Sequence, residues 1–319
     1  MRDYETFRII RGLPKPEERV ASALAIGNFD GLHLGHAALL KHVSQIAREK
    51  RLVPTALTFE PHPREFFKDS SVRLISTLRD RCIAILRCGI KRIHILPFDA
   101  ALAGLSPETF ARKILLEGLN AQTVGVGENF TFGAKGAGTP EVLTELGQKL
   151  GFEVLTEPLL TIGNETVSST RIRDALESGD LRTTELLFGH PYQITGRVVH
   201  GSELGKTLGF PTLNIDILPP GSISKPALRG VFAVMVSGVE ESGKTFAGVA
   251  SLGVKPTVTS EARWLLEVNV FDWSGNAYGK MVKVTFVQKL RDEKKFSGLT
   301  ELKDAIARDA ISARNILSL

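Results

Sequence analysis

The sequence has few cysteines and no long apolar run. Its 319 residues include only Cys82 and Cys88, six positions apart in a helix-like stretch, so the two thiols lie on different faces. No His clusters beside them at metal-ligand spacing, and we expect reduced structural thiols rather than a disulfide framework or a zinc site. No run of eighteen or more apolar residues occurs, and the first twenty residues lack the apolar core of a secretion signal. We therefore expect a cytoplasmic protein with no membrane partner.

The sequence also lacks a basic segment interleaved with aromatic residues, which is the usual pattern of a nucleic-acid surface. The net charge is +5, and the excess of Lys and Arg is spread along the chain. Binding of anionic small molecules would explain this small excess of positive charge as well as binding of DNA or RNA would, and we expect no nucleic-acid partner. What is present, 43% hydrophobic and 24% charged residues, is the composition of an ordinary globular protein. No feature of the pattern defines an oligomeric state.

The first half of the sequence alternates short apolar or β-branched runs with longer stretches of helical spacing. Strands are predicted at 23–29, 53–59, 92–98, 121–127 and 152–158, and helices at 36–50, 77–89, 106–119 and 139–151. Ser106 and Thr139 each supply an N-cap, and the Pro that follows each suits the first helical position. The alternation predicts an α/β domain with an open, doubly wound parallel sheet. Ligands of such sheets bind beyond the carboxyl ends of the strands.

From about Gly189 onward, strands follow one another closely. They are predicted at 194–201, 210–217, 230–238, 245–253, 264–272 and 280–288. This pattern predicts an antiparallel sheet or small β-barrel, followed by a terminal helix at 300–317. The sequence therefore predicts two domains, residues 1–186 and 187–319, with a linker around 186–193.

One segment, GVEESGKT at 238–245, matches the G-x-x-x-x-G-K-[ST] pattern of a phosphate-binding loop. That loop requires a following helix, but the next residues, FAGVASLGV, alternate as in a strand and include two Gly. Glu240 and Glu241 would also place two carboxylates beside a triphosphate, where like charges repel. We therefore interpret the segment as a hairpin turn and expect ATP to bind elsewhere.

A second glycine-rich segment, AIGNFDGLHLGH, leads from a predicted strand into a helix that starts near 33–36. Its Gly residues let the backbone approach a ligand, and the N–H groups of a helix start suit phosphate. His33 and His36 lie three residues apart and share a face of that first turn. Either His alone could merely cap or pack the helix. Together they can donate hydrogen bonds to phosphate oxygens as charge develops in a displacement at phosphorus.

This segment resembles the H-x-G-H nucleotidyltransferases, which transfer an adenylyl or cytidylyl group from a nucleoside triphosphate. The resemblance implies that His33 and His36 are catalytic. It also implies nucleotide contacts from four residues of the segment, namely Gly27, Phe29, Asp30 and Gly31.

The second part of the signature in those enzymes is a Ser-Ser/Thr segment with Arg or Lys at a helix start, and VSSTRIRDAL at 167–176 resembles it. Ser169 is the expected N-cap, and Thr170, Arg171 and Arg173 are expected to hold the triphosphate at that terminus. Taken alone, the segment fits a surface helix equally well.

Six segments, in this order, resemble those of the bacterial bifunctional riboflavin kinase/FAD synthetases: GNFDGLHLGH, TFEPHPREFF, VGENFTFGAKGAG, VSSTRIR, GRVVHGSELGKTLGFPTLNI and RDEKKF. The resemblance covers the chain from about Leu24 to its end. It implies that the N-terminal domain joins FMN to AMP from ATP, releasing pyrophosphate, and that the C-terminal domain phosphorylates riboflavin to FMN. Riboflavin, FMN and ATP are then the partners, Mg²⁺ is the cofactor, and each domain needs its own ATP.

In the N-terminal domain the resemblance implies that Asn129 binds near the reacting phosphates. It also implies that TFEPHP forms part of the flavin side of the pocket, through Phe59, His62 and Pro63. By itself, TFEPHP fits a simple turn at the end of a strand.

In the C-terminal domain the resemblance assigns ATP binding to GSELGKTLGFPTLN, through Gly201, Gly205, Lys206 and Gly209. Thr212 and Asn214 offer hard oxygen ligands suited to Mg²⁺. PTLN resembles the P-T-A-N element of the family, with Leu213 in place of Ala on the alternate side of the strand.

Glu267 matches the family's catalytic base, and Arg291 and Phe296 of RDEKKF match a loop that closes over flavin. From the pattern alone, a mid-strand Glu faces solvent and RDEKK is a solvated charge run. Two departures from the family, Phe232 where Tyr is common and SLGVKPTV without Phe after its Pro-Thr, affect packing or flavin contacts rather than phosphoryl chemistry.

Two alternatives stay open. One is an H-x-G-H adenylyltransferase with another acceptor and a barrel that only binds, and the other is a flavin- or nucleic-acid-binding regulator whose catalytic residues are relics. The complete PTLN and Glu267 set argues against the first, and the lack of a basic aromatic patch argues against the second.

Overall fold

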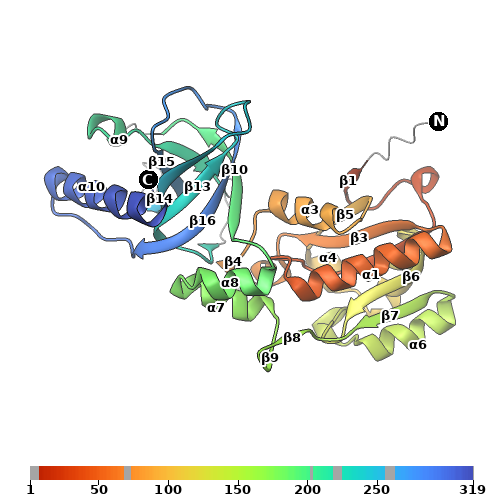
Figure 1. Ribbon diagram of the computed structural model, residues 1–319. Coiled ribbons are helices and arrows are strands. Elements are labelled where there is room, and N and C mark those ends of the chain that lie inside the picture. The colour runs from red at the N-terminus through yellow and green to blue at the C-terminus, as the bar shows by residue number, and fades with distance from the viewer. Residues whose placement is uncertain (1–6, 68–72, 202–203, 218–224, 256–262, 319) are drawn as a thin grey trace. The chain divides into compact units, whose positions relative to one another are not determined.

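The structure is a computed structural model that describes residues 7–67, 73–201, 204–217, 225–255 and 263–318 (Figure 1). The chain forms two compact units. The first consists of the residues up to 72 together with 81–168, and the second consists of residues 73–80 and 169–319. Pro256 to Val258 of SLGVKPTV, and with them that departure from the family, lie outside the described residues.

The first unit is built on a six-stranded sheet in which every neighbouring pair is parallel. The strands, in spatial order, are β1 (Arg8–Arg11), β5 (Arg92–Pro97), β3 (Val53–Glu60), β2 (Ser22–Ile26), β6 (Ala121–Gly127) and β7 (Glu153–Glu157). The chain passes from β2 to β3 on one side and later returns to β6 on the other side of β2. The order of the strands therefore reverses between β2 and β6, which is the point where open α/β sheets bind ligands.

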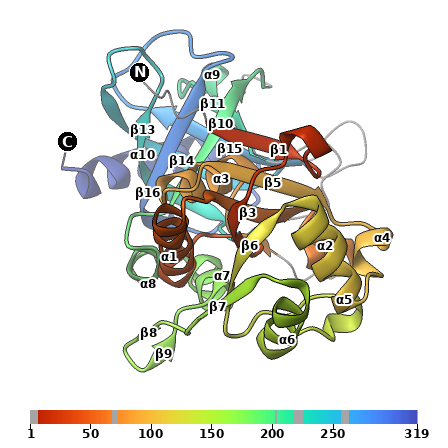
Figure 2. The ribbon, with the colours of Figure 1, turned by 90° about the vertical axis from the view of Figure 1, so that its right-hand side faces the viewer.

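Helices cover both faces of this sheet (Figure 2). They are α1 (Leu34–Lys50), α2 (Pro63–Phe66), α3 (Leu78–Arg87), α4 (Ala100–Ala103), α5 (Pro107–Thr109) with a π-helical continuation (Phe110–Gly118), and α6 (Pro140–Leu150). Val124 and Val126 of β6 face a core formed with the π-helical segment and α6. Between them, Gly125 faces α1, and a Cβ there would lie 2.5 Å from Val43. This glycine lets α1 pack closely on the opposite face.

The second unit contains a closed barrel of antiparallel strands in the order β10 (Gln193–Val199), β11 (Leu213–Asp216), β15 (Arg263–Val270), β14 (Thr245–Lys255), β13 (Gly230–Ser237) and β16 (Met281–Arg291). The helices are α7 (Ser169–Ser178), α8 (Leu181–Phe188), α9 (Leu204–Thr207) and α10 (Leu299–Ile316). The buried face of α10 includes Ala313, which packs with residues of β13 and β14. Closure of the barrel leaves its described strands without an open edge.

Residues 73–80 belong to the second unit although they lie in the first half of the sequence. In this segment β4 (Arg73–Leu74) pairs in parallel with β12 (Lys225–Pro226). The Tyr192 hydroxyl donates to the Ile75 carbonyl at 2.7 Å, and the Thr195 N–H donates to Asp80 at 2.9 Å. Helix α3 thus begins in the second unit and continues in the first.

The structure confirms the predicted fold class and most of its elements. GVEESGKT is the turn between β13 and β14, where Ser237 pairs with Thr245, so the hairpin interpretation is confirmed. Ser106 and Thr139 are the N-caps of α5 and α6. The described helices include none with the length and apolarity needed to cross a membrane. Cys82 and Cys88 are buried and form no disulfide.

Three local features differ from what the sequence predicted. Strand β1 and the two-stranded hairpin of β8 (Thr161–Ile162) and β9 (Glu165–Thr166) were not expected. Helix α7 starts with Ser169 as its first residue, so the N-cap position falls one residue earlier. The helix expected at 106–119 is α-helical only at its start and continues with π-helical hydrogen bonding.

Candidate active sites

The turn after β2 is anchored by Phe29. This residue adopts a positive φ of 51° and is fully buried. A Cβ on Gly27 would lie 2.9 Å from the Phe29 ring, so the ring packs against a backbone that has no room for a side chain. Gly31 has a φ of 60°, a conformation in which only glycine is unstrained. Asp30, between them, is 1% exposed.

His33 and His36 are held together at the start of α1. His33 is the N-cap, and its Nδ1 accepts the His36 backbone N–H at 3.2 Å. The two imidazole rings stack with their centroids 3.7 Å apart, and the Phe29 ring meets the His36 ring edge-on at 5.4 Å. Because Nδ1 of His33 is an acceptor, the neutral ring carries its proton on Nε2. The arrangement therefore leaves His33 with a hydrogen-bond donor on the opposite side of its ring.

Asn129 follows β6, the strand beside β2, and is exposed two residues beyond the end of that strand. Because β2 and β6 are parallel neighbours, the turn with His33 and the loop with Asn129 leave the same edge of the sheet. These predicted residues are therefore brought to one end of the first unit.

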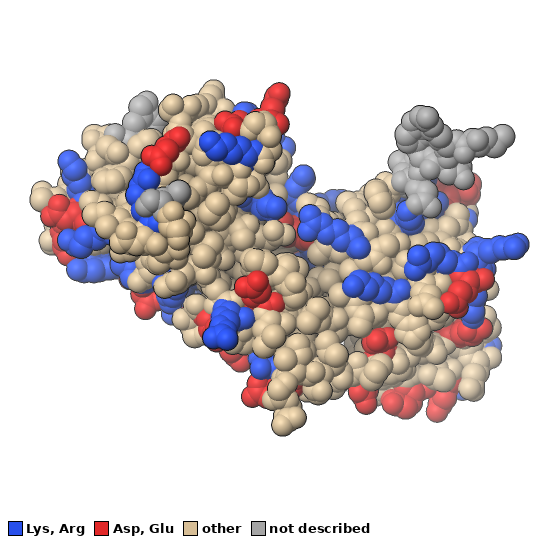
Figure 3. All heavy atoms as spheres, viewed as in Figure 1, with Lys and Arg blue, Asp and Glu red and all other residues tan. Residues whose placement is uncertain are grey.

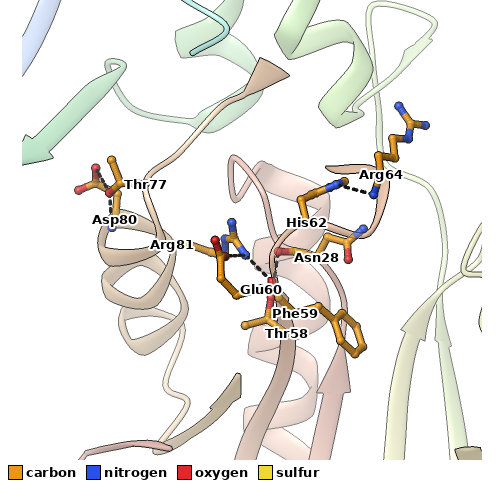
Figure 4. Close-up of polar contacts among 9 residues, drawn as sticks. All are labelled: Asn28, Thr58, Phe59, Glu60, His62, Arg64, Thr77, Asp80 and Arg81. Atoms are coloured by element: carbon orange, nitrogen blue, oxygen red, sulfur yellow. Dashed lines mark hydrogen bonds and ion pairs between the residues drawn. The ribbon is translucent and has the colours of Figure 1, made fainter. Parts of the chain in front are cut away.

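The TFEPHP segment begins at the end of β3, the other neighbour of β2. Phe59 is buried in the core, and its ring meets Phe98 edge-on at 5.9 Å. His62 is the N-cap of α2 and accepts the Arg64 N–H at 3.2 Å, and Pro63 is the first residue of that helix (Figure 4). Capping defines the direction in which the chain leaves the sheet.

An aromatic cluster beside this turn was not predicted from the sequence. Phe66 and Phe67 lie on and just after α2, and each ring contacts Phe98, with centroids 5.6 and 5.9 Å apart. Phe67 is 65% exposed. The repeated Phe in TFEPHPREFF was the available signal, because exposed neighbouring aromatic residues are uncommon without a ligand or partner.

Ser169, Thr170 and Arg171 form the first turn of α7 and belong to the second unit. Thr170 is exposed, and the other two are half-buried. A helix start of this kind, with hydroxyls and a guanidinium in its first turn, suits a phosphate group.

In the barrel, Asn214 and Glu267 face each other directly across β11 and β15. Directly opposed residues in antiparallel strands project to the same face, with Cβ atoms about 4.5–5.5 Å apart. Asn214 is 5% exposed, and within the described residues its Oδ1 has no hydrogen-bond partner. A Cβ on Gly201 would lie 2.2 to 2.5 Å from the amide atoms of Asn214. Glycine at 201 therefore leaves the space that the Asn214 amide occupies.

The segment between β10 and β11 surrounds this pair. A Cβ on Gly205 would lie 2.4 Å from the Phe210 carbonyl and 3.2 Å from the Thr212 hydroxyl, and Gly209 has a φ of 89°. Thr212 lies two residues before Asn214, on the same side of an extended chain. The side chain of Lys206 lies outside the described part of the chain.

Arg291, at the end of β16, is held by the terminal helix. Its guanidinium donates three hydrogen bonds to the Asp309 carboxylate at 2.7 to 3.1 Å and lies over the Phe296 ring at 5.6 Å. Asp309 is 8% exposed on the buried face of α10. Asp309 was not predicted from the sequence. The signal was a carboxylate in the apolar stripe of a helix, four residues after buried Ala305 and four before buried Ala313.

The loop after Arg291 is tied to the start of α10 by Glu301. Its carboxylate accepts a hydrogen bond from Lys294 at 2.8 Å, and from the backbone and side chain of Ser297 at 2.9 and 2.8 Å. The Lys294 ammonium and the Ser297 donors lower the pKa of Glu301 to about 2.

Two family models match the chain, FAD synthetase over residues 15–171 and riboflavin kinase over residues 188–317. A bifunctional riboflavin kinase/FMN adenylyltransferase of Escherichia coli (strain K12) is 37% identical over 317 residues, which cover 98% of each chain. The chain belongs to the bifunctional riboflavin kinase/FMN adenylyltransferases. The family resemblance of its motifs is thereby confirmed.

Relatives of this name in Haemophilus influenzae and Bacillus subtilis are 38% and 36% identical. The first match covers 96% of this chain and 98% of the relative, and the second covers 92% of each. A solved structure from Streptococcus pneumoniae, named a macrolide-efflux protein, aligns with a TM-score of 0.75 and 27% identity over 96% of this chain and 99% of that one. That name belongs to the Streptococcus protein.

As a bifunctional riboflavin kinase/FMN adenylyltransferase, the chain is an enzyme with two activities. The FAD synthetase match includes five strands of the first sheet, all but β1, together with His33 and His36. The riboflavin kinase match includes the barrel, with Glu267. The two sets of predicted catalytic residues thus fall in separate family matches.

Proposed function

We propose that the two activities have separate centres, each with its own ATP. The adenylyltransferase centre is formed at the carboxyl ends of β2, β3 and β6, and the kinase centre surrounds Asn214 and Glu267 in the barrel. The support is that His33, His36 and Asn129 lie in the first unit, whereas Asn214 and Glu267 lie in the second.

At the adenylyltransferase centre a phosphate oxygen of FMN attacks the α-phosphorus of ATP, and pyrophosphate leaves with the electron pair of the broken P–O bond. His33 and His36 donate hydrogen bonds to phosphate oxygens as charge grows on them. The support is the hydrogen bond that occupies Nδ1 of His33 and keeps a proton on Nε2. Further nucleotide contacts are assigned to the 27–31 turn, Asn129 and the first turn of α7.

At the kinase centre Glu267 accepts the proton of the ribityl hydroxyl while that oxygen takes the γ-phosphoryl group, and ADP leaves. Thr212 and Asn214 would hold Mg²⁺ through their oxygen atoms, which are the ligands this ion prefers. The fit is supported by the buried Asn214 Oδ1, which lacks a hydrogen-bond partner in the described residues. A bound Mg²⁺ neutralises charge on the phosphates of ATP.

Flavin contacts are assigned to aromatic residues in each unit. In the first unit, exposed Phe67 forms an aromatic cluster with half-buried Phe66 and Phe98, and an isoalloxazine ring can stack on such a surface. In the second unit, the assignment of Phe296 is supported by the Arg291 guanidinium lying over its ring.

The remaining proposals concern location and partners. We propose a cytoplasmic enzyme whose partners are small anionic molecules and riboflavin, with no nucleic-acid partner. On the face of the barrel seen in Figure 3, Lys and Arg side chains lie among Asp and Glu side chains. Interspersed charges of both signs support this proposal, because a nucleic-acid surface concentrates positive charge.

The observation that carries the proposal is the direct pairing of Asn214 with Glu267 beside the backbone of Gly201. The full-length Glu267→Gln variant tests it, because Gln keeps the volume but not the basic oxygen. With riboflavin, ATP and Mg²⁺, FMN formation should fall by roughly 10²-fold or more. FAD formation from supplied FMN should be unchanged when the flavins are separated by chromatography.

Glu241→Gln is the matched control, since Glu241 is an exposed residue of the β13–β14 turn. It should leave both reactions unchanged. A Glu267→Gln enzyme that phosphorylates riboflavin within a few-fold of the parent would show that Glu267 is a bystander on the barrel.

A further inference from the structure

Arg81 is the largest fully buried side chain of the described residues, and it is a charged one. It lies on α3 and is 1% exposed. Its Nη1 donates to the Phe59 carbonyl at 3.1 Å and lies 3.4 Å from Oε2 of Glu60 (Figure 4). A buried guanidinium is costly unless it is paired, so a residue of this kind in a helix facing the sheet requires an explanation beyond packing.

The position of the Phe59 carbonyl supplies part of that explanation. The Leu57 carbonyl accepts the Gly27 N–H at 3.1 Å, so odd-numbered residues at this end of β3 direct their carbonyls toward β2. β2 ends at Ile26, and the Phe59 carbonyl lies two residues further along β3. The Phe59 carbonyl therefore lies beyond the end of β2, and Arg81 donates to it in place of a backbone N–H of that strand.

The pair is not saturated by hydrogen bonds. Among residues 7–67, 73–201 and the other described segments, Nε of Arg81 and Oε2 of Glu60 have no hydrogen-bond partner. Buried polar atoms in stable cores are nearly always satisfied. If the pair only stabilised the fold, hydrogen bonds to these two atoms would add to its stability. That they have none in the described residues favours a role connected with the site at the carboxyl end of β3.

The charge of Glu60 depends on its surroundings. Burial raises the pKa of Glu60, and the neighbouring Arg81 acts in the opposite direction. The carboxylates of Glu65 and Asp30 raise it further, and Arg11 lowers it. Glu60 therefore binds a proton at a higher pH than an ordinary Glu, and its attraction to Arg81 weakens as it does so.

We propose that Arg81 and Glu60 are positioning residues for the FMN side of the adenylyltransferase centre. They hold the carboxyl end of β3, from which the turn with His62, α2 and the aromatic cluster leave the sheet. This inference rests on the proposed function, which places FMN at that turn. The pair acts on FMN through the turn and takes no part in the transfer of the adenylyl group.

The test uses the full-length Arg81→Met variant, in which the stem is kept and the charge is removed. We expect KM for FMN in FAD synthesis to rise by about tenfold or more, since small displacements at a binding site have effects of this size. KM for ATP in the same reaction should stay within about twofold of the parent, and riboflavin phosphorylation should be unchanged. Arg87→Met is the matched control, because Arg87 is exposed on the same helix.

Two further variants keep the test decisive if Arg81→Met folds poorly. Arg81→Lys retains the charge and one donor, and KM for FMN should lie between the values of the parent and Arg81→Met. Glu60→Gln retains the volume, and its KM for FMN should exceed that of the parent at neutral pH. That difference should shrink as the pH falls, because Glu60 of the parent then becomes protonated.

Different outcomes would overturn the proposed function and the positioning role of Arg81 and Glu60. A parent enzyme that makes no FAD, or a His33→Ala variant that makes it normally, would overturn the proposed function. A parent that makes FAD, together with Arg81 and Glu60 variants whose KM for FMN equals that of the Arg87→Met control, would overturn the positioning role alone. Equal rises in KM for FMN and for ATP, with a lowered melting temperature, would show a purely structural pair and overturn it as well.

Discussion

Replacing Asp309 with Ala tests whether the terminal helix holds Arg291. The Asp309 side chain is 11% exposed, and its carboxylate accepts three hydrogen bonds at 2.7 to 3.1 Å. Removing one partner of a fully buried ion pair costs about 3–5 kcal/mol, whereas an exposed pair contributes about 0.2–1 kcal/mol. Because the Arg291 side chain is 29% exposed, water can solvate its guanidinium once the carboxylate is gone. We expect the free energy of unfolding of the second unit to fall by about 2 kcal/mol, between these limits.

Urea unfolding followed by tryptophan fluorescence measures this loss. Trp264 and Trp273 are the only tryptophans, and both belong to the second unit, so the signal reports that unit alone. Asp304→Ala is the matched control, because Asp304 is exposed on the same helix and the substitution gives a similar gain in helix propensity. The difference in the free energy of unfolding between the two variants gives the contribution of the ion pair.

The same variant has a kinetic consequence. Without Asp309 the Arg291 guanidinium loses its fixed position over Phe296, and KM for riboflavin should rise by about tenfold, a change typical of a lost hydrogen bond to a charged group. FAD synthesis from supplied FMN should be unaffected. If Asp309→Ala and Asp304→Ala agree in both unfolding and KM, the terminal helix does not hold the flavin loop and the reasoning is wrong.

Three further predictions concern single residues. His36→Ala should slow adenylylation about 10²–10³-fold, which is the effect of losing one preorganised donor, and should leave FMN formation unchanged. Equal losses of FMN and FAD on chromatography would indicate misfolding instead. Gly201→Ala should slow FMN formation at least about tenfold, because its Cβ would displace the Asn214 amide. Gly298→Ala, where nothing lies within 4 Å, should have no effect, and a fully active Gly201→Ala enzyme would contradict the assigned metal site. The pKa of Glu301 is lowered from 4.5 to about 2, so its contribution to stability is complete above pH 4.5 and is lost as the pH falls toward 2. The free energy of unfolding, measured with urea, should therefore fall less over this pH range in Glu301→Gln than in the parent. The same pH dependence in both proteins would count against the ion pair.

The barrel and the parallel sheet could be predicted from the sequence because their strands carry period-two or continuous apolar patterns. The catalytic candidates could be predicted because they lie in short motifs, as His33 and His36 do at one helix start. The direct opposition of Asn214 and Glu267 could not be predicted. It depends on the register between β11 and β15, which are distant in the sequence, and a shift of one residue would place the two side chains on opposite faces.

Arg81 and Asp309 were missed for a different physical reason. Helical periodicity predicts which positions are buried, and charged residues are expected to face water. Both residues occupy buried positions and are stabilised by partners on other elements, Glu60 and Arg291, which lie 21 and 18 residues away in the sequence. Only the three-dimensional pairing shows that the charge can be buried. A charged residue within an apolar helical stripe is the pattern that would have marked them.

The membership of residues 73–80 in the second unit has a consequence for synthesis of the chain. Ile75 and Asp80 are made 117 and 115 residues before their hydrogen-bonding partners, Tyr192 and Thr195. At roughly 5–20 residues per second, this separation corresponds to a delay of about 6–23 s on the ribosome. Strands β1, β2 and β3 are translated before this segment, and β5, β6 and β7 are translated within that interval. The adenylyltransferase sheet can therefore form before residues 73–80 have their hydrogen-bonding partners. The kinase unit is completed last, when its barrel strands have been synthesised and residues 73–80 can pack with them.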